Sequence, residues 1–286
     1  MLFRRSLAIA LTLPGVGCSA TVSATSGDAE PRLTTSAIVV VERMVDSAGA
    51  SRAEASARFV RVAAPASTEE AFRAIGAALV LPASGHCVSL AALSGTSLVG
   101  EPAPVVELLD VGSVSLNADG RETHLASRLL PDVTDVVSGV VYARTADPGL
   151  LPADSRYTVR VAGGSDLPPF EVLASAPADP SNVLTDGATV GGTLVVSGPS
   201  LSFSWPPGAD SDVVYVDLQP GAQRCVLAGE AAAGDPLVRA SIQTALLGDS
   251  GTLVVHRVRS GALVSQGLEG GELRFDFGRS QSYVRR

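Results

Sequence analysis

Residues Gly271–Gly278 read GELRFDFG, and this octapeptide shows most directly what kind of structure the chain forms. Charged residues at positions 272, 274 and 276 alternate with Leu or Phe at positions 273, 275 and 277. A period of two residues is typical of a strand with one buried face. We therefore predict a strand here, the last one of a β-sheet protein.

The rest of the chain from Ser36 onward has the pattern of short segments and turn residues that is typical of an all-β protein. Short Val-rich segments are separated by Gly, Pro, Asp and Ser, and long helical periods are missing. The Asn117–Gly120 segment predicts a hairpin turn, Ser67–Glu70 predicts a capped helix start, and Leu237–Leu247 predicts a short helix. The predicted strands are Ala37–Val45, Ala53–Val62, Cys87–Leu93, Val105–Leu109, Ser113–Asn117, Val136–Arg144, Arg156–Val161, Phe170–Ala174, Thr193–Val196, Leu201–Trp205, Val213–Leu218, Arg224–Ala228, Thr252–Val258, Ala262–Gln266 and Glu272–Phe277.

The length of 286 residues suggests about two domains. Ala176–Asp186 contains two prolines and two aspartates, which is typical of a domain boundary. The predicted organisation is a signal peptide at 1–17, a lipidated Cys and disordered tether at 18–35, and β-sandwich domains at 36–177 and 185–286.

Two short patterns resemble the immunoglobulin and fibronectin type III sandwiches. Leu151–Val161 is similar to their tyrosine corner, in which the hydroxyl of a Tyr, here Tyr157, bonds back to the upstream backbone. Leu201–Trp205, followed by two prolines and then Tyr215, is similar to the second and third strands of a fibronectin module. The resemblance implies an all-β fold with two sandwich domains of this kind, and no binding residue is carried over from it.

The N-terminus has the order of an export signal. Arg4 and Arg5 precede the apolar run Leu7–Leu13, which is too short to span a bilayer. The following Gly15–Cys18 segment resembles the lipobox of bacterial lipoproteins, in which the Cys is acylated, although Gly15 stands where that motif prefers Leu. Cleavage after Ala24 is the alternative, and it would release a soluble periplasmic or extracellular protein.

The layout of leader, Cys, Ser/Thr-rich tether and Val-rich β modules also resembles that of secreted lipoproteins from bacteria with GC-rich genomes. This resemblance implies a location, the cell envelope with a lipid anchor at Cys18, and it implies no reaction. The membrane would then be a partner through the N-terminal lipid.

The composition excludes several classes of function. All 21 basic residues are Arg, so a pyridoxal-phosphate Schiff base and a P-loop, which both need Lys, are excluded. The formal net charge of −8 argues against a nucleic-acid partner, which requires clustered positive charge. Gly163-Gly164 and Gly191-Gly192 lack the spacing of a dinucleotide-binding loop. We expect no cofactor.

Cys87 and Cys225 remain once Cys18 is acylated. In an oxidising compartment they are candidates for a disulfide, but the predicted boundary places them in different modules, and a disulfide needs Cα atoms within about 7 Å. Two buried unpaired thiols are the alternative. If the cysteines do pair, the two modules must be packed edge to edge.

No residue is nominated for catalysis or metal binding. His86, His124 and His256 lack metal-ligand spacing. Two aspartate groups could supply calcium ligands but do not follow an EF-hand pattern, and the serines at 94 and 165 are turn formers without a nucleophile elbow. The aspartates concerned are Asp210, Asp212 and Asp217, and separately Asp132 and Asp135.

From these observations we expect a cell-envelope lipoprotein without enzymatic activity, a structural or interaction module that presents its loops to a protein or glycan. The alternative is an exported hydrolase or carbohydrate-processing protein whose site is assembled from distant loop carboxylates. A deep pocket that holds two or three acids would favour the alternative.

Overall fold

A computed structural model describes residues 32–94, 105–130, 137–231 and 235–286. Residues Arg32–Arg286 form one compact unit, and the described part is a β-sandwich protein, so the predicted all-β fold class is confirmed. The predicted signal peptide, Cys18 and residues 18–31 of the tether lie outside the described residues. The first strand begins at Leu33, so residues 33–35 of the predicted tether belong to a strand.

The chain up to residue 175 forms nine described strands and two short α-helices. The helices α1 and α2 and the 3-10 helix η1 span Thr68–Ala74, Leu90–Ser94 and Pro148–Leu150. The strands are β1 (Leu33–Val45), β2 (Ser51–Ala63), β3 (Cys87–Ser89), β4 (Val106–Leu108), β5 (Val114–Ala118), β6 (Arg121–Leu130), β7 (Val137–Ala146), β8 (Arg156–Val161) and β9 (Phe170–Ser175).

The remainder of the chain ends with two long strands, β18 and β19. Two further 3-10 helices, η2 (Pro180–Asn182) and η3 (Thr244–Leu246), lie in this part. The strands are β10 (Leu184–Thr185), β11 (Ala188–Thr189), β12 (Thr193–Val196), β13 (Ser200–Trp205), β14 (Asp212–Gln219), β15 (Gln223–Val226), β16 (Glu230–Ala231), β17 (Val238–Gln243), β18 (Ser250–Ala262) and β19 (Gly270–Arg285).

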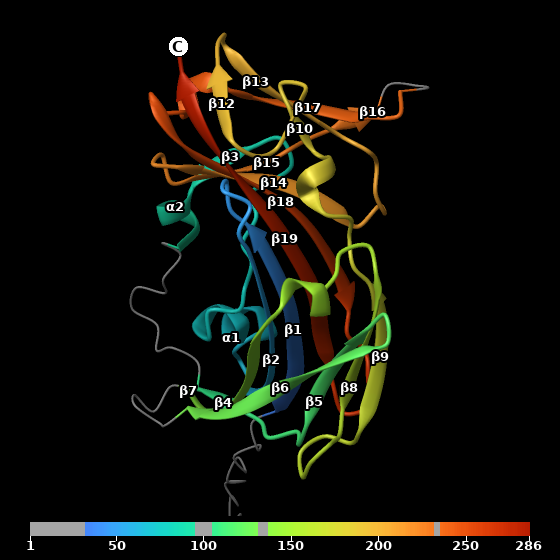
Figure 1. Cartoon of the computed structure of the whole chain (residues 1–286). Helices are drawn as coiled ribbons and strands as arrows, with labels where there is room; N and C mark the ends of the chain where they lie inside the picture. Colours follow the sequence, from blue (N-terminus) through green and yellow to red (C-terminus); the bar gives the residue numbers. More distant parts are fainter. Residues whose placement is uncertain (1–31, 95–104, 131–136, 232–234) are drawn as a thin grey trace, which may run out of the picture. The chain divides into compact units, whose positions relative to one another are not determined.

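Strand β19 is the centre of the larger sheet (Figure 1). It pairs with β18 in antiparallel orientation along most of its length. On its other side it pairs in parallel with β1 through its first half and with β12 through its last four residues. The sheet order is β3-β15-β14-β18-β19-β1-β2-β4-β7-β6-β5-β8-β9, and a second sheet has the order β11-β10-β13-β17-β16.

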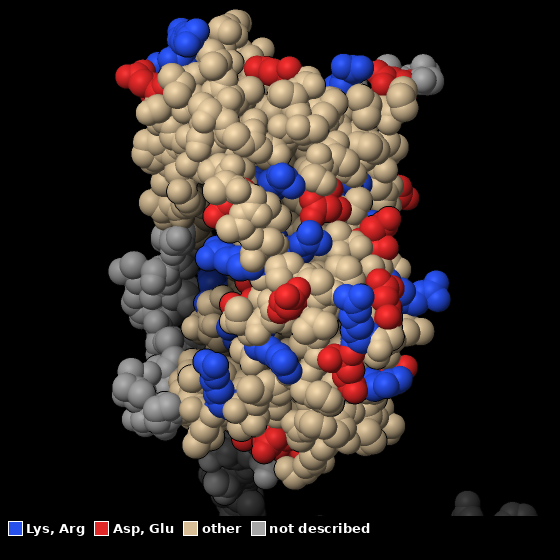
Figure 2. Space-filling view, viewed as in Figure 1, with Lys and Arg blue, Asp and Glu red and all other residues tan. Residues whose placement is uncertain are grey.

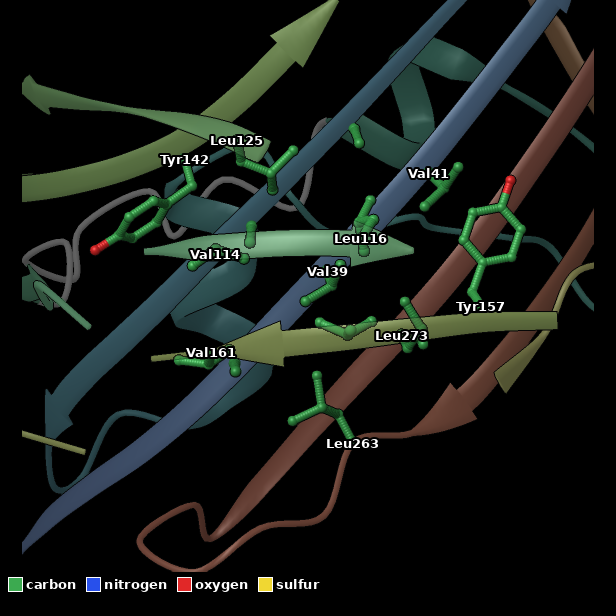
Figure 3. Close-up of a cluster of buried hydrophobic side chains, with 14 of the residues drawn as sticks. Val39, Val41, Val114, Leu116, Leu125, Tyr142, Tyr157, Val161, Leu263 and Leu273 are labelled. Atoms are coloured by element: carbon green, nitrogen blue, oxygen red, sulfur yellow. The ribbon is translucent and has the colours of Figure 1, made fainter. Parts of the chain in front are cut away.

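The first hydrophobic core lies where the larger sheet folds over itself. Strands β5 and β8 cover one face of β1, β2 and β19, and Figure 3 shows Leu116 beside Val39, with Val161 further along the same side of β1. Phe275 and Tyr157 add a ring contact with centroids 4.9 Å apart. This arrangement closes a sandwich around the alternate apolar residues of each strand.

The second core lies between the smaller sheet and the other halves of β18 and β19. Phe203 and Trp205 of β13 face Val216 of β14 and Val255 of β18, and all four are buried. Tyr283, near the end of β19, belongs to this core. The two cores are therefore lined by different parts of the same strand.

Strand pairing crosses the boundary predicted from the sequence. The segment around η2 does separate most residues of the two cores, but β19 pairs with β1 of the first predicted module. Strand β3 of that module pairs with β15 of the second. Residues 36–177 and 185–286 thus share one sheet.

The opposite face of the larger sheet is covered by α1 and by residues 77–86, here called the covering segment. Phe72 of α1 packs against Ile38 and Val40, so β1 is buried on both faces. This explains the continuous apolar run in β1, which a half-buried strand would not have. Leu79 and Leu81 of the covering segment pack near Tyr215.

Several local predictions are confirmed. The Tyr157 hydroxyl donates to the Pro152 carbonyl at 2.8 Å, which is the tyrosine corner. Asp119 and Gly120 adopt positive φ in the turn between β5 and β6. Ser67 caps α1, and Glu70 completes the capping box.

Other local predictions are wrong. The predicted helix at Leu237–Leu247 is strand β17 followed by η3, because Val238–Gln243 pair residue by residue with β13. The strand expected at Cys87–Leu93 ends at Ser89 and continues as α2. The strand expected at Ala262–Gln266 is the end of β18 and the following turn. Strand β6 was missed, since only Thr123 and Leu125 are buried along its length.

Candidate functional site

The described chain contains a buried polar cluster on the face of the larger sheet that the covering segment crosses. Tyr215 of β14 stacks on His256 of β18, with ring centroids 4.3 Å apart and planes 8° from parallel. The Tyr215 hydroxyl donates to Asp276 Oδ2 at 2.9 Å, and His256 Nδ1 lies 2.7 Å from Asp276 Oδ1. We call Tyr215, His256 and Asp276 the tyrosine–histidine cluster.

Register brings these three residues together. Tyr215 lies opposite His256, which lies opposite Gly278, two residues beyond Asp276 on the same face of β19. A Cβ at Gly278 would lie 3.1 Å from His256 and 2.2 Å from the sulfur of Met44, so a larger residue would displace the Met44 side chain. The absence of a side chain at Gly278 therefore allows Met44 and His256 to approach the same point of β19.

A row of acidic residues continues from the cluster across the sheet. Asp276 lies opposite Glu42 of β1, and Glu42 lies opposite Glu54 of β2. Arg58 and Arg274 flank this row on the same face, and Arg274 donates to the carbonyl of Ala77 at 2.7 Å. Within the described ranges, no three His, Cys, Asp or Glu side chains are arranged to hold a metal ion.

The environment shifts the pKa values of these groups in different directions. Burial raises the pKa of the Tyr215 hydroxyl, so the group is neutral and donates its hydrogen. Burial alone would raise the pKa of Asp276, but the hydrogen bond and charge of His256 outweigh it and lower that pKa. Loss of water around Glu42, together with the charges of Asp276 and Glu54, raises the pKa of Glu42.

The covering segment is fastened to this face next to the cluster. Arg224 lies 4.8 Å from the centroid of the Tyr215 ring, donates to both carboxylate oxygens of Asp217 at 2.8 Å, and donates to the carbonyl of Val80. Where this segment ends, Cys87 and Cys225 form a disulfide with Cα atoms 4.0 Å apart, and both pack against the second core on the opposite face of the sheet. Strands β3 and β15 carry the two cysteines opposite each other.

A second polar cluster lies on the other face of β18. Asp212 accepts hydrogen bonds from the guanidinium groups of Arg257 and Arg259, and the side chains of Asp212 and Arg257 are only 4% and 2% exposed. Arg259 also donates to the carbonyls of Ser175 and Ala176. We call Asp212, Arg257 and Arg259 the arginine cluster.

A hollow of about 670 Å³ opens beside the arginine cluster. Its lining is mostly apolar and comes from the covering segment, the loop between β13 and β14, and the region after β15. Leu81, Pro82, Pro207 and Val238 are among the lining residues. Asp210 is exposed at this hollow, whereas Asp212 is already bound by two arginines.

The structure separates the aspartates that were considered together. Asp212 and Asp217 are five residues apart on β14 and therefore belong to opposite faces of the sheet. Asp217 is paired with Arg224, and Asp212 with the arginine cluster. Asp132 and Asp135 lie outside the described residues.

The histidines have separate environments. His86 is exposed and its Nδ1 lies 3.1 Å from the carbonyl of Ser84. His124 is exposed on β6, 3.5 Å from Glu122. Ser165 bonds to Asp166 in a turn, and the side chain of Ser94 lies outside the described part.

The sequence did not reveal the cluster around His256, because its members come from three strands whose register cannot be read from any one of them.

Comparisons with known proteins give no family. No protein-family model matches the chain, and no curated protein matches it. Among solved structures, Rst D1-D2 is 8% identical and its match covers 71% of this chain and 93% of its own, with a TM-score of 0.23.

Two further solved structures are similarly remote. The Fcho1 Mu homology domain of Danio rerio, solved with an Eps15 peptide, is 12% identical over 88% of this chain and 97% of its own, with a TM-score of 0.23. The full ectodomain of mouse nectin-like molecule 4 (Ig1–Ig3) is 11% identical over 87% of this chain and 64% of its own, with a TM-score of 0.22. All three TM-scores are below 0.5 and carry no information on function.

Proposed function

We propose that this protein is a cell-envelope lipoprotein, anchored through Cys18, that acts as a non-enzymatic interaction module. The observation that carries the proposal is the hollow beside the arginine cluster, which is mostly apolar and whose described lining contains one uncommitted carboxylate, that of Asp210. Apolar concave surfaces with few polar groups are typical of binding sites. The hollow therefore supports recognition of a partner.

The chemistry of the hollow favours a protein segment over a glycan as that partner. Its lining offers apolar side chains from Leu81, Pro207 and Val238 and few polar side chains that could bond to hydroxyl groups. Trp205 also lines it, but only 6% of this residue is exposed, so its ring presents little surface for stacking. An apolar side chain of a protein partner fits such a lining.

The same hollow gives little support to a carboxylate hydrolase. A glycosidase of the usual kind uses two carboxyl groups flanking the scissile bond. Asp210 is one candidate, but Asp212 accepts hydrogen bonds from two arginines and lies beneath the loop that contains Gly208. A Cβ at Gly208 would lie 2.0 Å from Asp212, which shows how closely this loop covers the ion pair.

Location and export are supported by the sequence of the first 18 residues and by the disulfide, which is typical of oxidising compartments. No helix of the described residues has the length and apolar character needed to cross a bilayer. Intact mass spectrometry of the protein purified from its own host tests the anchor. We expect a chain that begins at Cys18 and carries an acyl group; a chain that begins at Thr25, or one that retains residues 1–17, would contradict the proposal.

The interaction role is tested by a matched pair of substitutions. Ala228 and Ala188 are both exposed, but only Ala228 lines the hollow. We expect Ala228→Arg to abolish the partner crosslink that the wild-type protein forms in its own envelope, and Ala188→Arg to leave the crosslink unchanged. Turnover of a substrate in a hydrolase screen, lost in Asp210→Asn, would instead establish the enzymatic alternative.

A further inference from the structure

Exposed large apolar side chains gather at one end of the described chain. Leu129 and Val264 are 76% and 78% exposed, and three more Leu or Val residues that are at least 40% exposed lie at the same end. Exposed apolar patches of this kind mark surfaces that contact a membrane or another protein. The five residues, here called the apolar end, are Leu33, Val105, Leu129, Leu130 and Val264.

Strand register shows that these residues share one end although they are far apart in sequence. The start of β1 lies opposite the end of β2, which lies opposite the start of β4. The start of β4 pairs with the start of β7, and Gly139 of β7 lies opposite Leu130 at the end of β6. The turn between β18 and β19, which contains Val264, lies next to the start of β1 (Figure 1, lower end).

The remaining exposed large apolar residues lie elsewhere. Leu173 is on the outward side of the edge strand β9. Val195 and Val284 lie opposite each other on β12 and β19, near the other end of β19. They provide matched controls, because Val195 is 46% exposed and of the same residue type as Val264.

The polar groups of the apolar end are compatible with an anionic lipid surface. Arg128, directly before Leu129, is exposed and forms no ion pair within the described ranges. Arg32 is exposed and is paired with Glu269 at 3.3 Å. In Figure 2 the lowest part of the visible face is mostly uncharged, with one acidic group. An apolar tip beside an unpaired Arg is suited to the interface of a bilayer containing anionic lipids.

The described chain also begins at this end. Arg32 directly precedes β1, and residues 18–31 connect it to the proposed lipid at Cys18. Fully extended, this connection reaches at most about 50 Å. An anchor on so short a connection holds the apolar end within reach of the bilayer, and raises its effective concentration there.

We infer that the apolar end docks onto the lipid surface, so that the protein contacts the membrane through its loop ends as well as through its lipid anchor. This inference rests on the proposed anchoring through Cys18. Docking by the apolar end fixes the orientation of the sandwich, with the β12 end directed away from the bilayer.

Site-directed spin labelling of the full acylated protein in phosphatidylethanolamine–phosphatidylglycerol vesicles tests the orientation. A nitroxide placed by Val264→Cys is expected to collide more with oxygen and less with an aqueous nickel complex than one placed by Val195→Cys. Equal, water-like accessibility at the two sites would overturn the inference. Dipolar broadening between labels at 264 would show that a second copy covers this end, which would also overturn it.

A chain carrying Cys18→Ser separates this inference from the proposed anchor. Its binding to phosphatidylglycerol vesicles is expected to weaken about tenfold on Leu129→Ser, the change that follows when one Leu loses about half of its transfer free energy. Val195→Ser is the control and leaves binding unchanged. If Cys18 carries no acyl group in the native protein, the anchor fails while this measurement still decides the docking; binding that is insensitive to Leu129→Ser overturns the docking alone.

Discussion

The two faces of β18 carry different polar clusters. On one face His256 joins a ring stack and a carboxylate, and Arg224 beside the stack donates to the carbonyl of Val80 in the covering segment. On the other face Arg257 and Arg259 share Asp212 and reach the segment near residue 176, with ionic and hydrogen bonds only. Hydrogen bonds thus hold a distant segment on each face, and the Cys87–Cys225 disulfide adds a covalent link between β3 and β15 at the edge of the sheet.

The largest expected effect on stability comes from removing the disulfide. Replacing both cysteines, in Cys87→Ala with Cys225→Ala, removes a crosslink between residues separated by 138 positions. The chain-entropy model assigns about 4–5 kcal/mol to a loop of this size, so the free energy of unfolding should fall by that amount. Urea denaturation measures it, and reductant added to the wild-type protein should produce the same loss. A loss below about 1 kcal/mol would show that the covering segment is held by its noncovalent contacts.

Disrupting the arginine cluster should reduce stability nearly as much. Asp212→Ala leaves Arg257 buried without its carboxylate, and breaking a buried ion pair in this way costs about 3–5 kcal/mol. Asp210→Ala is the control at an exposed position two residues away, and should change stability by no more than about 0.5 kcal/mol. Similar effects of the two substitutions in urea denaturation would contradict a structural role for the arginine cluster.

The tyrosine–histidine cluster should depend on pH. The pKa of Asp276 is lowered in the folded protein, so its contribution to stability is present above the usual Asp value of about 3.9 and is lost as the pH falls through the folded value. Asp276→Asn should cost about 1–3 kcal/mol at pH 7 and less under acid conditions. Thermal unfolding measured across this pH range gives the profile; parallel profiles for the two proteins would rule out this linkage.

The smallest expected effect is a gain in stability. Glu42 lies opposite both Glu54 and Asp276, and like charges directly opposite each other destabilise a sheet. Glu42→Gln should therefore stabilise the protein at pH 7 by about 0.2–1 kcal/mol. Because the pKa of Glu42 is raised, ionised Glu42 opposes folding only at higher pH, and the gain should vanish below about 4.3, the usual Glu value. A gain that persists in acid would point to a cause other than charge.

The sequence predicted strands best where one face is buried. GELRFDFG was predicted as a strand over Glu272–Phe277, and the structure extends that strand to Gly270–Arg285. The added residues do not alternate strictly between apolar and charged side chains, since β19 passes there from one core to the other and carries Arg279 and Gln281 in between. Pairing with β12 and β18 determines that part of the strand, and such pairing is not visible in a local pattern.

Pairing between distant strands also limited the prediction of the site. The Cys87–Cys225 disulfide looked doubtful for two separate modules, but β3 crosses over to pair with β15. The residues of the tyrosine–histidine cluster each fit an ordinary strand pattern. Only the register of β14, β18 and β19 places their side chains on one spot.

The position of β19 also determines when the two sandwiches can fold. Strand β1 acquires β2 as a neighbour almost at once, but its other edge stays open until β19, about 230 residues further along, has been made. Neither sandwich can close earlier, because both cores contain residues of β19. Folding of both sandwiches therefore waits for β19 and is slowed by contacts between distant residues. Removal of β19 would therefore prevent both sandwiches from forming.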